Sequence, residues 1–147
     1  HEPLLPEMMV IASQEPEILK YAESKGAKGI NLGGLCCSAN EVLMRHGIPV
    51  AGNFLQQELA ITTGAVELMT VDVQCQMESL YQVSTCYHTK LITTDRRAKI
   101  EGAQHIPFEE EKGLEIARDI LKIAIDNFAN RDQAKVLIPD ETQEMVV

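Results

Sequence analysis

The sequence has 147 residues, of which 45% are hydrophobic, and it carries a formal net charge of −9 at pH 7. This length fits one domain with a substantial hydrophobic core. The acidic excess argues against nucleic acid or an anionic membrane as the main partner, since both bind clustered Lys and Arg. No stretch approaches the roughly 20 apolar residues that span a bilayer, and no basic-then-apolar leader begins the chain. We therefore expect a cytoplasmic protein without a transmembrane segment.

The pattern along the chain predicts helices and strands in alternation. We expect helices over residues 6–12, 16–25, 38–46, 54–63, 77–85 and 113–128, and strands over residues 29–35, 50–51, 68–73, 90–94 and 104–108. The helix over 113–128 has the clearest pattern, because its apolar residues recur at steps of three and four. The strand over 29–35 is short, mostly apolar and bounded by glycines, which favours a strand over a helix. Residues 38–41 match a capping box that would start a helix at Ser38.

Strands that alternate with helices through short connections indicate a parallel sheet with helices on both faces. The predicted strands lack polar alternation, as expected for parallel strands that are buried on both sides. The sequence thus predicts one Rossmann-like α/β domain over residues 1–147. The first residue is His1 rather than Met, so we expect a processed chain or a piece of a longer one.

Four cysteines occur, at positions 36, 37, 75 and 86. Cys36 and Cys37 are adjacent and the chain is not a small loop-rich scaffold, so reduced thiols or metal ligands are favoured over disulfides. Cys36 and Cys37 would lie in the loop after one predicted strand, and Cys75 follows another by two residues. Because functional groups of an α/β sheet gather at the carboxyl ends of its strands, Cys37 and Cys75 are expected at the same edge. A strand that ended just before His1 would bring His1 to that edge too.

Soft thiolates select iron–sulfur, zinc or copper(I), and imidazole suits nickel, iron, zinc and copper. One His and two separated Cys make a partial ligand set. An iron–sulfur cluster usually takes about four protein ligands, and the chain has neither a Cys-x-x-Cys pair nor zinc-finger spacing. The residues alone therefore leave the metal open.

Several motifs in order resemble the anaerobic nickel–iron–sulfur carbon monoxide dehydrogenases. They are His1-Glu2-Pro3, Gly34-Leu35-Cys36-Cys37, the run from Asn40 to Pro49, Ala51-Gly52-Asn53-Phe54-Leu55-Gln56-Gln57-Glu58, and Asp72-Val73-Gln74-Cys75. The similarity covers nearly the whole chain and corresponds to a central stretch of a much longer family polypeptide. It implies a Rossmann-like domain of the hybrid-cluster and CO dehydrogenase type.

The resemblance implies specific ligands. His1 and Cys37 would bind the pendant iron of a nickel-bearing iron–sulfur cluster, Cys75 would bind an iron of its cubane portion, and Cys36 would assist assembly or an alternative coordination state. The remaining ligands, the proton-transfer residues and additional [4Fe-4S] clusters would lie outside this chain. No catalytic residue is assigned within it, and the chain alone is expected to be inactive.

The implied reaction is the reversible oxidation of CO with water to CO2, two protons and two electrons. The resemblance also implies a ferredoxin-like electron carrier, a homodimer of the complete polypeptide and an acetyl-CoA synthase as a further partner. Two alternatives stay open: a hybrid-cluster-type reductase with iron, sulfur and oxygen, and a non-catalytic α/β fragment. Judged by position alone, each Cys could also be ordinary core, and Cys86 is interpreted as structural.

Overall fold

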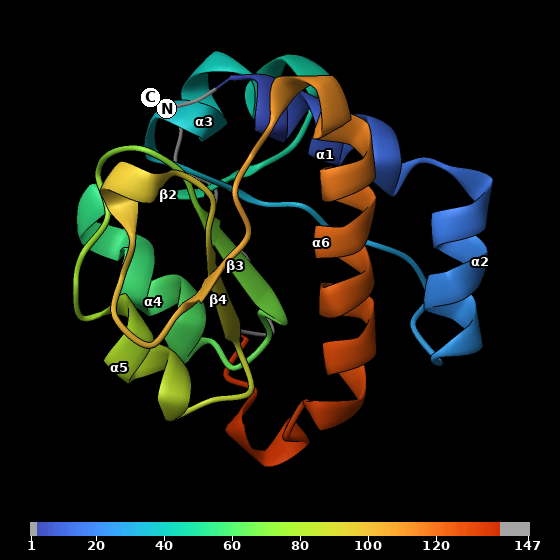
Figure 1. Ribbon diagram of the computed structural model, residues 1–147. Coiled ribbons are helices and arrows are strands. Elements are labelled where there is room, and N and C mark those ends of the chain that lie inside the picture. The colour runs from blue at the N-terminus through green and yellow to red at the C-terminus, as the bar shows by residue number, and fades with distance from the viewer. Residues whose placement is uncertain (1–2, 139–147) are drawn as a thin grey trace, which may run out of the picture.

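Helices and strands alternate along the chain in the computed structural model, which describes residues 3–138 (Figure 1). The α-helices are α1 (Leu4–Ser13), α2 (Pro16–Ser24), α3 (Cys36–Glu41), α4 (Gln57–Thr62), α5 (Leu80–Thr85) and α6 (Gly113–Asn127). The strands are β1 (Gly34–Leu35), β2 (Val50–Gly52), β3 (Leu68–Val71), β4 (Lys90–Thr93) and β5 (Gln104–His105). Short 3-10 helices are η1 (Leu43–His46), η2 (Phe54–Gln56), η3 (Arg96–Ala98), η4 (Glu110–Lys112), η5 (Phe128–Asn130) and η6 (Gln133–Lys135).

All strand pairs among the described residues are parallel, as predicted, but they form two sheets rather than one. One sheet has the order β1-β2 and the other the order β3-β4-β5. In the larger sheet Leu68 is opposite Lys90 and Val71 is opposite Thr93. The α/β class with parallel pairing is therefore confirmed, and the expectation of one continuous sheet is wrong for residues 3–138.

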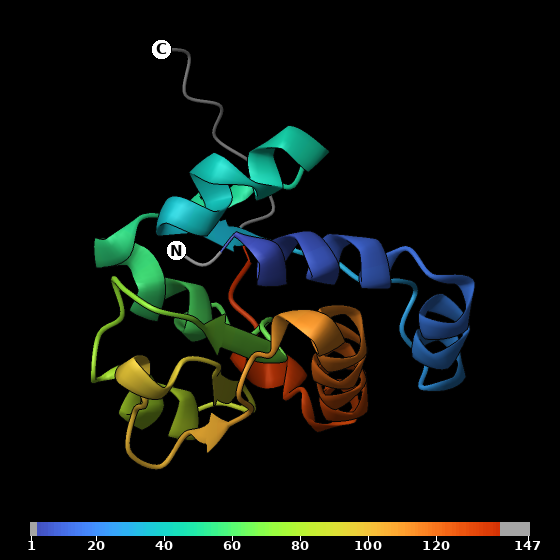
Figure 2. The ribbon, with the colours of Figure 1, turned by 45° about the horizontal axis from the view of Figure 1, so that its top comes forward.

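Helices cover both faces of the larger sheet, as the α/β pattern predicts. Successive residues of a strand point to opposite faces, and in β4 Leu91 and Ile92 belong to different core clusters. Leu91 packs in a cluster with Ile61 of α4 and Leu80 of α5, whereas Ile92 packs with residues of α1 and α6. Figure 2 shows the same arrangement, with α1 and α6 on one side of β3.

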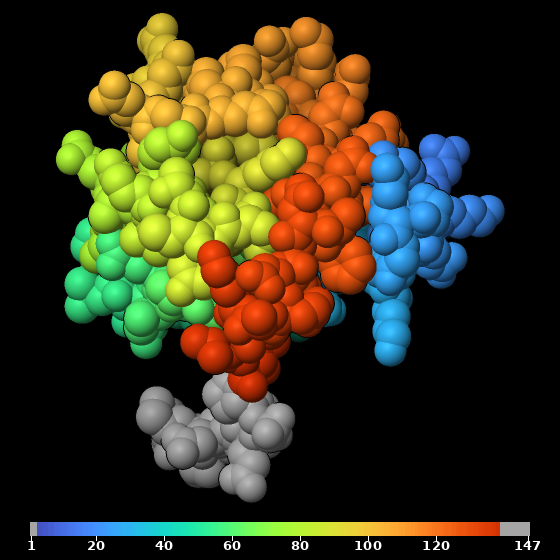
Figure 3. Space-filling view, turned by 90° about the horizontal axis from the view of Figure 1, so that it is seen from below, coloured from blue at the N-terminus to red at the C-terminus, as the bar shows by residue number. Residues whose placement is uncertain are grey.

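The end of the molecule opposite α3 is formed by the segment that follows α6. Leu137 N donates a hydrogen bond of 2.8 Å to Thr63 O, which ties this segment to the end of α4. In Figure 3 this segment (red) lies between α6 and the α4–α5 side of the molecule. It therefore covers the amino-terminal ends of the strands and leaves their carboxyl ends beside α3.

Several predicted boundaries near the cysteines are wrong. Of the strand expected over 29–35, only Gly34–Leu35 pairs, and the strand expected over 68–73 ends at Val71. Leu35 rather than Ser38 is the N-cap of α3, without a side-chain cap, because Ser38 is already inside the helix. The helix expected to reach residue 46 instead ends at Glu41 and is followed by η1, which Gly47 terminates at a φ of 73°.

Candidate metal centre

Three of the four cysteines lie at the carboxyl ends of strands. Cys36 and Cys37 are the first two residues of α3, directly after β1, and not part of a connecting loop as expected. Cys75 lies four residues after the end of β3. All three line one cavity of about 940 Å³. Cys36, Cys37 and Cys75 therefore all border this cavity, and their assignment as metal ligands stays a prediction.

Two of these cysteines have an unusual backbone. Cys36 has a φ of 55° and Cys75 a φ of 57°, and no other residues except glycines have positive φ among residues 3–138. The left-handed region is unfavourable for residues with a Cβ atom, and such strain is concentrated at functional sites. Cys36 and Cys75, on two different segments that border the cavity, thus share a left-handed backbone conformation that glycine adopts more easily.

Gln57, the first residue of α4, connects the two cysteine segments. Its side-chain Nε2 donates to Cys36 Sγ at 3.4 Å and also to the carbonyl oxygen of Cys75. Its Oε1 accepts a hydrogen bond of 3.3 Å from Met77 N. Gln57 is only 5% exposed. A buried amide with three partners on two segments fixes the position of one segment relative to the other.

A second polar contact lies beside the first. Ser38 Oγ donates to Asp72 Oδ2 at 3.5 Å, and Val73 N donates to Asp72 Oδ1 at 2.6 Å. Ser38 follows Cys37 directly, and Asp72 follows β3 directly. This contact therefore links the same two strand ends as Gln57 does.

Close packing of α3 on its own strand depends on Gly34. A Cβ atom at this position would lie 2.6 Å from the Cβ and 2.7 Å from the Cα of Ala39. Real Cβ atoms do not approach this closely, so only glycine lets α3 pack here. The first turn of α3, with both cysteines, is held against the end of β1 as a result.

The described thiols are a partial ligand set. Cys36, Cys37, Cys75 and Cys86 form no disulfide. Cys36 and Cys37 are half-buried and Cys75 is exposed at the cavity, whereas Cys86 is exposed at the end of α5 and does not line the cavity. Among residues 3–138 no three His, Cys, Asp or Glu side chains are grouped closely enough to hold a metal ion. Thiolates are soft ligands that suit an iron–sulfur cluster, and three of these thiols border one cavity. A cluster usually takes about four protein ligands, so further ligands are needed to complete the set.

The histidines of the described region have other partners. His46 Nε2 lies 2.9 Å from Glu7 Oε2, His88 Nε2 lies 3.1 Å from Glu67 Oε1, and His105 Nδ1 lies 3.0 Å from Thr93 Oγ1. None of these three lines the cavity. His1, the histidine predicted as a ligand, lies outside the described residues.

Sequence reasoning assigned no role at the site to Gln57 or Asp72, and it interpreted Ser38 as a helix cap. Gln57 and Asp72 lie inside the motifs that resemble the CO dehydrogenases, so the motifs themselves were the available signal. Neither position follows from periodicity, because each contact joins segments at least 18 residues apart. Within residues 3–138 no helix is long and apolar enough to cross a membrane.

The fold and the site define a parallel α/β domain with thiols at the carboxyl ends of two strands. The Prismane/CO dehydrogenase family matches residues 1–146, and the chain belongs to this family. Carbon monoxide dehydrogenase 1 of Methanosarcina acetivorans is 55% identical over 147 residues, which are 100% of this chain and 23% of the relative. The chain thus spans about a quarter of the length of the curated relatives it matches.

Two further proteins show the same similarity. The carbon monoxide dehydrogenase/acetyl-CoA synthase subunit beta of Moorella thermoacetica is 48% identical over 148 residues, covering 99% of this chain and 22% of the relative. A crystal structure of Ni-free carbon monoxide dehydrogenase from Thermococcus sp. AM4 superimposes with a TM-score of 0.91 at 51% identity, covering 95% of this chain and 22% of that one. The fold seen here is therefore the fold of the corresponding part of a solved CO dehydrogenase.

Proposed function

We propose that this chain is a cluster-binding part of a CO dehydrogenase, which oxidises CO with water to CO2, two protons and two electrons, reversibly. The observation that carries the proposal is that Cys37 and Cys75 both border one cavity, in a chain whose relatives are named carbon monoxide dehydrogenase. Because the chain spans 23% of such a relative, the activity is proposed for the longer polypeptide. The chain by itself is expected to be inactive.

The residues proposed as ligands fit the chemistry of a nickel–iron–sulfur cluster. Cys37 and Cys75 supply soft thiolate sulfur, His1 supplies imidazole nitrogen, and Cys36 is proposed as an assisting or alternative ligand. A bound cluster supplies Lewis-acidic metal that makes bound water far more acidic than bulk water, together with redox capacity. The relative from Thermococcus, which is described as Ni-free, supports nickel as the metal that the complete site takes.

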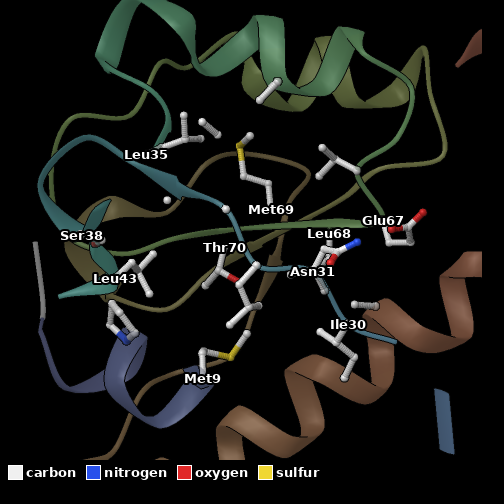
Figure 4. Close-up of a pocket in the computed structure, with 18 of the residues that line it drawn as sticks. Met9, Ile30, Asn31, Leu35, Ser38, Leu43, Glu67, Leu68, Met69 and Thr70 are labelled. Atoms are coloured by element: carbon white, nitrogen blue, oxygen red, sulfur yellow. The ribbon is translucent and has the colours of Figure 1, made fainter. Parts of the chain in front are cut away.

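The chain's own residues prepare the site for this chemistry. Gln57 and the Ser38–Asp72 contact fix the separation of the two cysteine segments. Apolar side chains, including Leu35 and Met69, make up much of the cavity wall (Figure 4). An apolar wall keeps bulk water away and strengthens the electrostatic interactions of any charged group held there.

The partners proposed for the complete polypeptide are a second copy of itself, a ferredoxin-like electron carrier and an acetyl-CoA synthase. The name of the Moorella relative, a subunit of carbon monoxide dehydrogenase/acetyl-CoA synthase, supports the last of these. A hybrid-cluster-type reductase and a non-catalytic fragment are the other functions considered. The 55% identity to a protein named carbon monoxide dehydrogenase favours the first function over both.

Substitution of the proposed ligands in the full-length polypeptide tests the proposal. Cys37→Ser and Cys75→Ser are each expected to abolish CO oxidation and to lower bound nickel and iron, with an unchanged circular dichroism spectrum. Cys86→Ser is the matched control, because this thiol is exposed like that of Cys75 but does not line the cavity. Wild-type turnover by Cys75→Ser would refute its assignment. A wild-type protein that binds iron but no nickel and does not oxidise CO would favour the hybrid-cluster alternative.

A further inference from the structure

The two cysteines with a left-handed backbone share one hydrogen-bond donor. Among residues 3–138, Cys36 and Cys75 are the two residues other than glycine that have a positive φ, of 55° and 57°. The side-chain nitrogen of Gln57, Nε2, donates to the sulfur of Cys36 at 3.4 Å and to the backbone carbonyl of Cys75. Strained conformations persist only where the surrounding structure holds them. A partner common to both cysteines therefore contributes to the position of both.

The orientation of the Gln57 amide is fixed by its oxygen. Gln57 Oε1 accepts a hydrogen bond of 3.3 Å from Met77 N, and a backbone N–H group can only donate. The amide oxygen therefore faces Met77, which leaves the amide nitrogen to face the cysteines. The side chain is 5% exposed, so water competes little for either end of the amide. Gln57 is thus a donor of fixed orientation in the wall of the cavity.

This hydrogen bond distinguishes two adjacent thiols that exposure does not distinguish. Cys36 and Cys37 are both half-buried, and both line the cavity, as do the flanking residues Leu35 and Ser38 (Figure 4). Gln57 donates to the sulfur of Cys36, whereas no hydrogen bond between residues 3–138 reaches the sulfur of Cys37. A donor on a sulfur atom stabilises the electron pair that the sulfur would otherwise give to a metal or an electrophile.

We propose that Gln57 is a positioning residue that gives the two adjacent cysteines different roles. Its amide nitrogen holds the sulfur of Cys36 in a hydrogen bond and leaves the sulfur of Cys37 available as the metal ligand. Through the carbonyl of Cys75, the same nitrogen sets the place of the second ligand. The assignment of Cys37 and Cys75 as ligands rests on the proposed function, whereas the holding of Cys36 by Gln57 does not.

Adjacent cysteines need such a distinction because their thiolates are equally soft ligands for the same metal ions. The difference must then come from groups around the doublet, as it does where outer groups orient metal ligands. Helix α4 supplies this group, since Gln57 is its first residue. The capping box between Asn53 and Gln56 fixes the turn directly before it. The selecting side chain therefore stands on a helix that carries no proposed ligand.

Alkylation of the reduced, metal-free full-length polypeptide by iodoacetamide tests the proposal. Mass spectrometry, with fragmentation between the two residues, gives separate rates for Cys36 and Cys37. The reaction is run at about pH 10, above the pKa of about 8.5 of an ordinary thiol, so that the rates report nucleophilicity and access. In the wild type, Cys36 is expected to react about fivefold or more slowly than Cys37, which corresponds to a hydrogen bond of about 1 kcal/mol.

Two variants of Gln57 remove the donor in different ways. Gln57→Leu replaces the amide by an apolar group of similar size, and Gln57→Asn shortens the side chain by one methylene, so that the nitrogen no longer reaches Cys36. Both should make the two alkylation rates similar. Gln56→Leu is the matched control, because Gln56 is exposed and its Oε1 accepts from Asn53 N at 2.9 Å. This control loosens the start of α4 but keeps the donor, so the wild-type ratio is expected.

The ratio of the two rates separates positioning from general stability. A side chain that only stabilised the fold would, when replaced, raise both rates together and leave their ratio unchanged. An unchanged ratio in Gln57→Leu and Gln57→Asn would therefore overturn the proposal, as would equal rates in the wild type. A change in Gln56→Leu as large as that in Gln57→Leu would show that loosening of α4 is the cause.

Failure of this proposal can be told apart from failure of the proposed function, because the alkylation rates are measured without metal. The expected ratio in a full-length protein that does not oxidise CO after metal loading would refute the proposed function and leave the role of Gln57 in place. CO oxidation by a protein whose two cysteines react equally fast would refute the role of Gln57 alone.

Discussion

The side-chain amide of Gln57 donates a hydrogen bond to the backbone carbonyl of Cys75, and the same nitrogen reaches Cys36 Sγ. One buried side chain on α4 thereby joins two segments that start from different sheets. We predict that Gln57→Leu destabilises the chain by about 1–3 kcal/mol, because the Cys75 carbonyl and Met77 N–H lose their partner. Urea denaturation of the metal-free chain measures this change.

Gln57→Glu is the informative comparison for that variant. It retains an acceptor for Met77 N but lacks the amide donor toward the cysteine segments. In the full-length polypeptide both variants are expected to bind less iron and nickel than wild type. Full metal content in Gln57→Leu would show that the bridge does not position the ligands.

The positive φ of Cys36 predicts an unusual ranking of two substitutions. Left-handed backbone costs a residue with a Cβ atom about 1–2 kcal/mol more than it costs glycine. Cys36→Gly should therefore be more stable than Cys36→Ala by about 1 kcal/mol in the metal-free chain, although glycine normally destabilises regular structure. Thermal unfolding of the two variants checks the ranking. The same pair at Cys37, whose φ is not positive, should show the opposite ranking.

The ion pair between Glu15 and Arg118 predicts a pH dependence of stability. Arg118 Nε and Nη2 donate to Glu15 at 2.7 and 2.6 Å, and these hydrogen bonds lower the pKa of Glu15 from its ordinary 4.5. A lowered pKa in the folded state gives stability that is present above pH 4.5 and is lost as the pH falls below it. Glu15→Gln should thus lower the Tm at pH 7, and the difference from wild type should shrink below pH 4.5.

The Tm of both proteins is measured at several pH values from about 3 to about 7, because this range includes the pKa values of carboxylates. Glu23→Gln is a suitable control because this residue is exposed on α2, the helix that directly follows Glu15. A difference between Glu15→Gln and wild type that stays constant across this range would contradict the assignment of the pH dependence to Glu15.

Asn127, at the end of α6, is predicted to hold this helix to the sheet. It is 2% exposed, and its Nδ2 donates to Glu67 O at 2.7 Å and to His88 O at 2.6 Å. Asn127→Ala leaves both carbonyls without this donor and should cost about 1–3 kcal/mol of unfolding free energy. Asn130→Ala, which removes only the hydrogen bond from Asn130 Nδ2 to Asn127 Oδ1, should cost less. Equal losses in urea denaturation would contradict the role given to Asn127.

The sequence by itself determined the α/β class, the parallel pairing and the position of Cys37 and Cys75 shortly after two strands. Local pattern is sufficient for these, because apolar periodicity, glycines and prolines define elements, and alternating elements restrict the topology. The motifs around Cys36, Cys37 and Cys75 likewise identify the family without any coordinates. The boundaries around α3 were predicted less well, since Ser38 matches a capping pattern but contacts Asp72 instead.

Only the tertiary structure decided how the site is built. The Gln57 bridge, the backbone of Cys36 and Cys75, and the division into two sheets all depend on contacts between distant segments. Residues 29–33 have a strand-like sequence, yet pairing needs a neighbour on the open side as well as propensity. The sequence can indicate which segments are able to pair, whereas the fold alone shows that β1 and β3 are separated by a cavity.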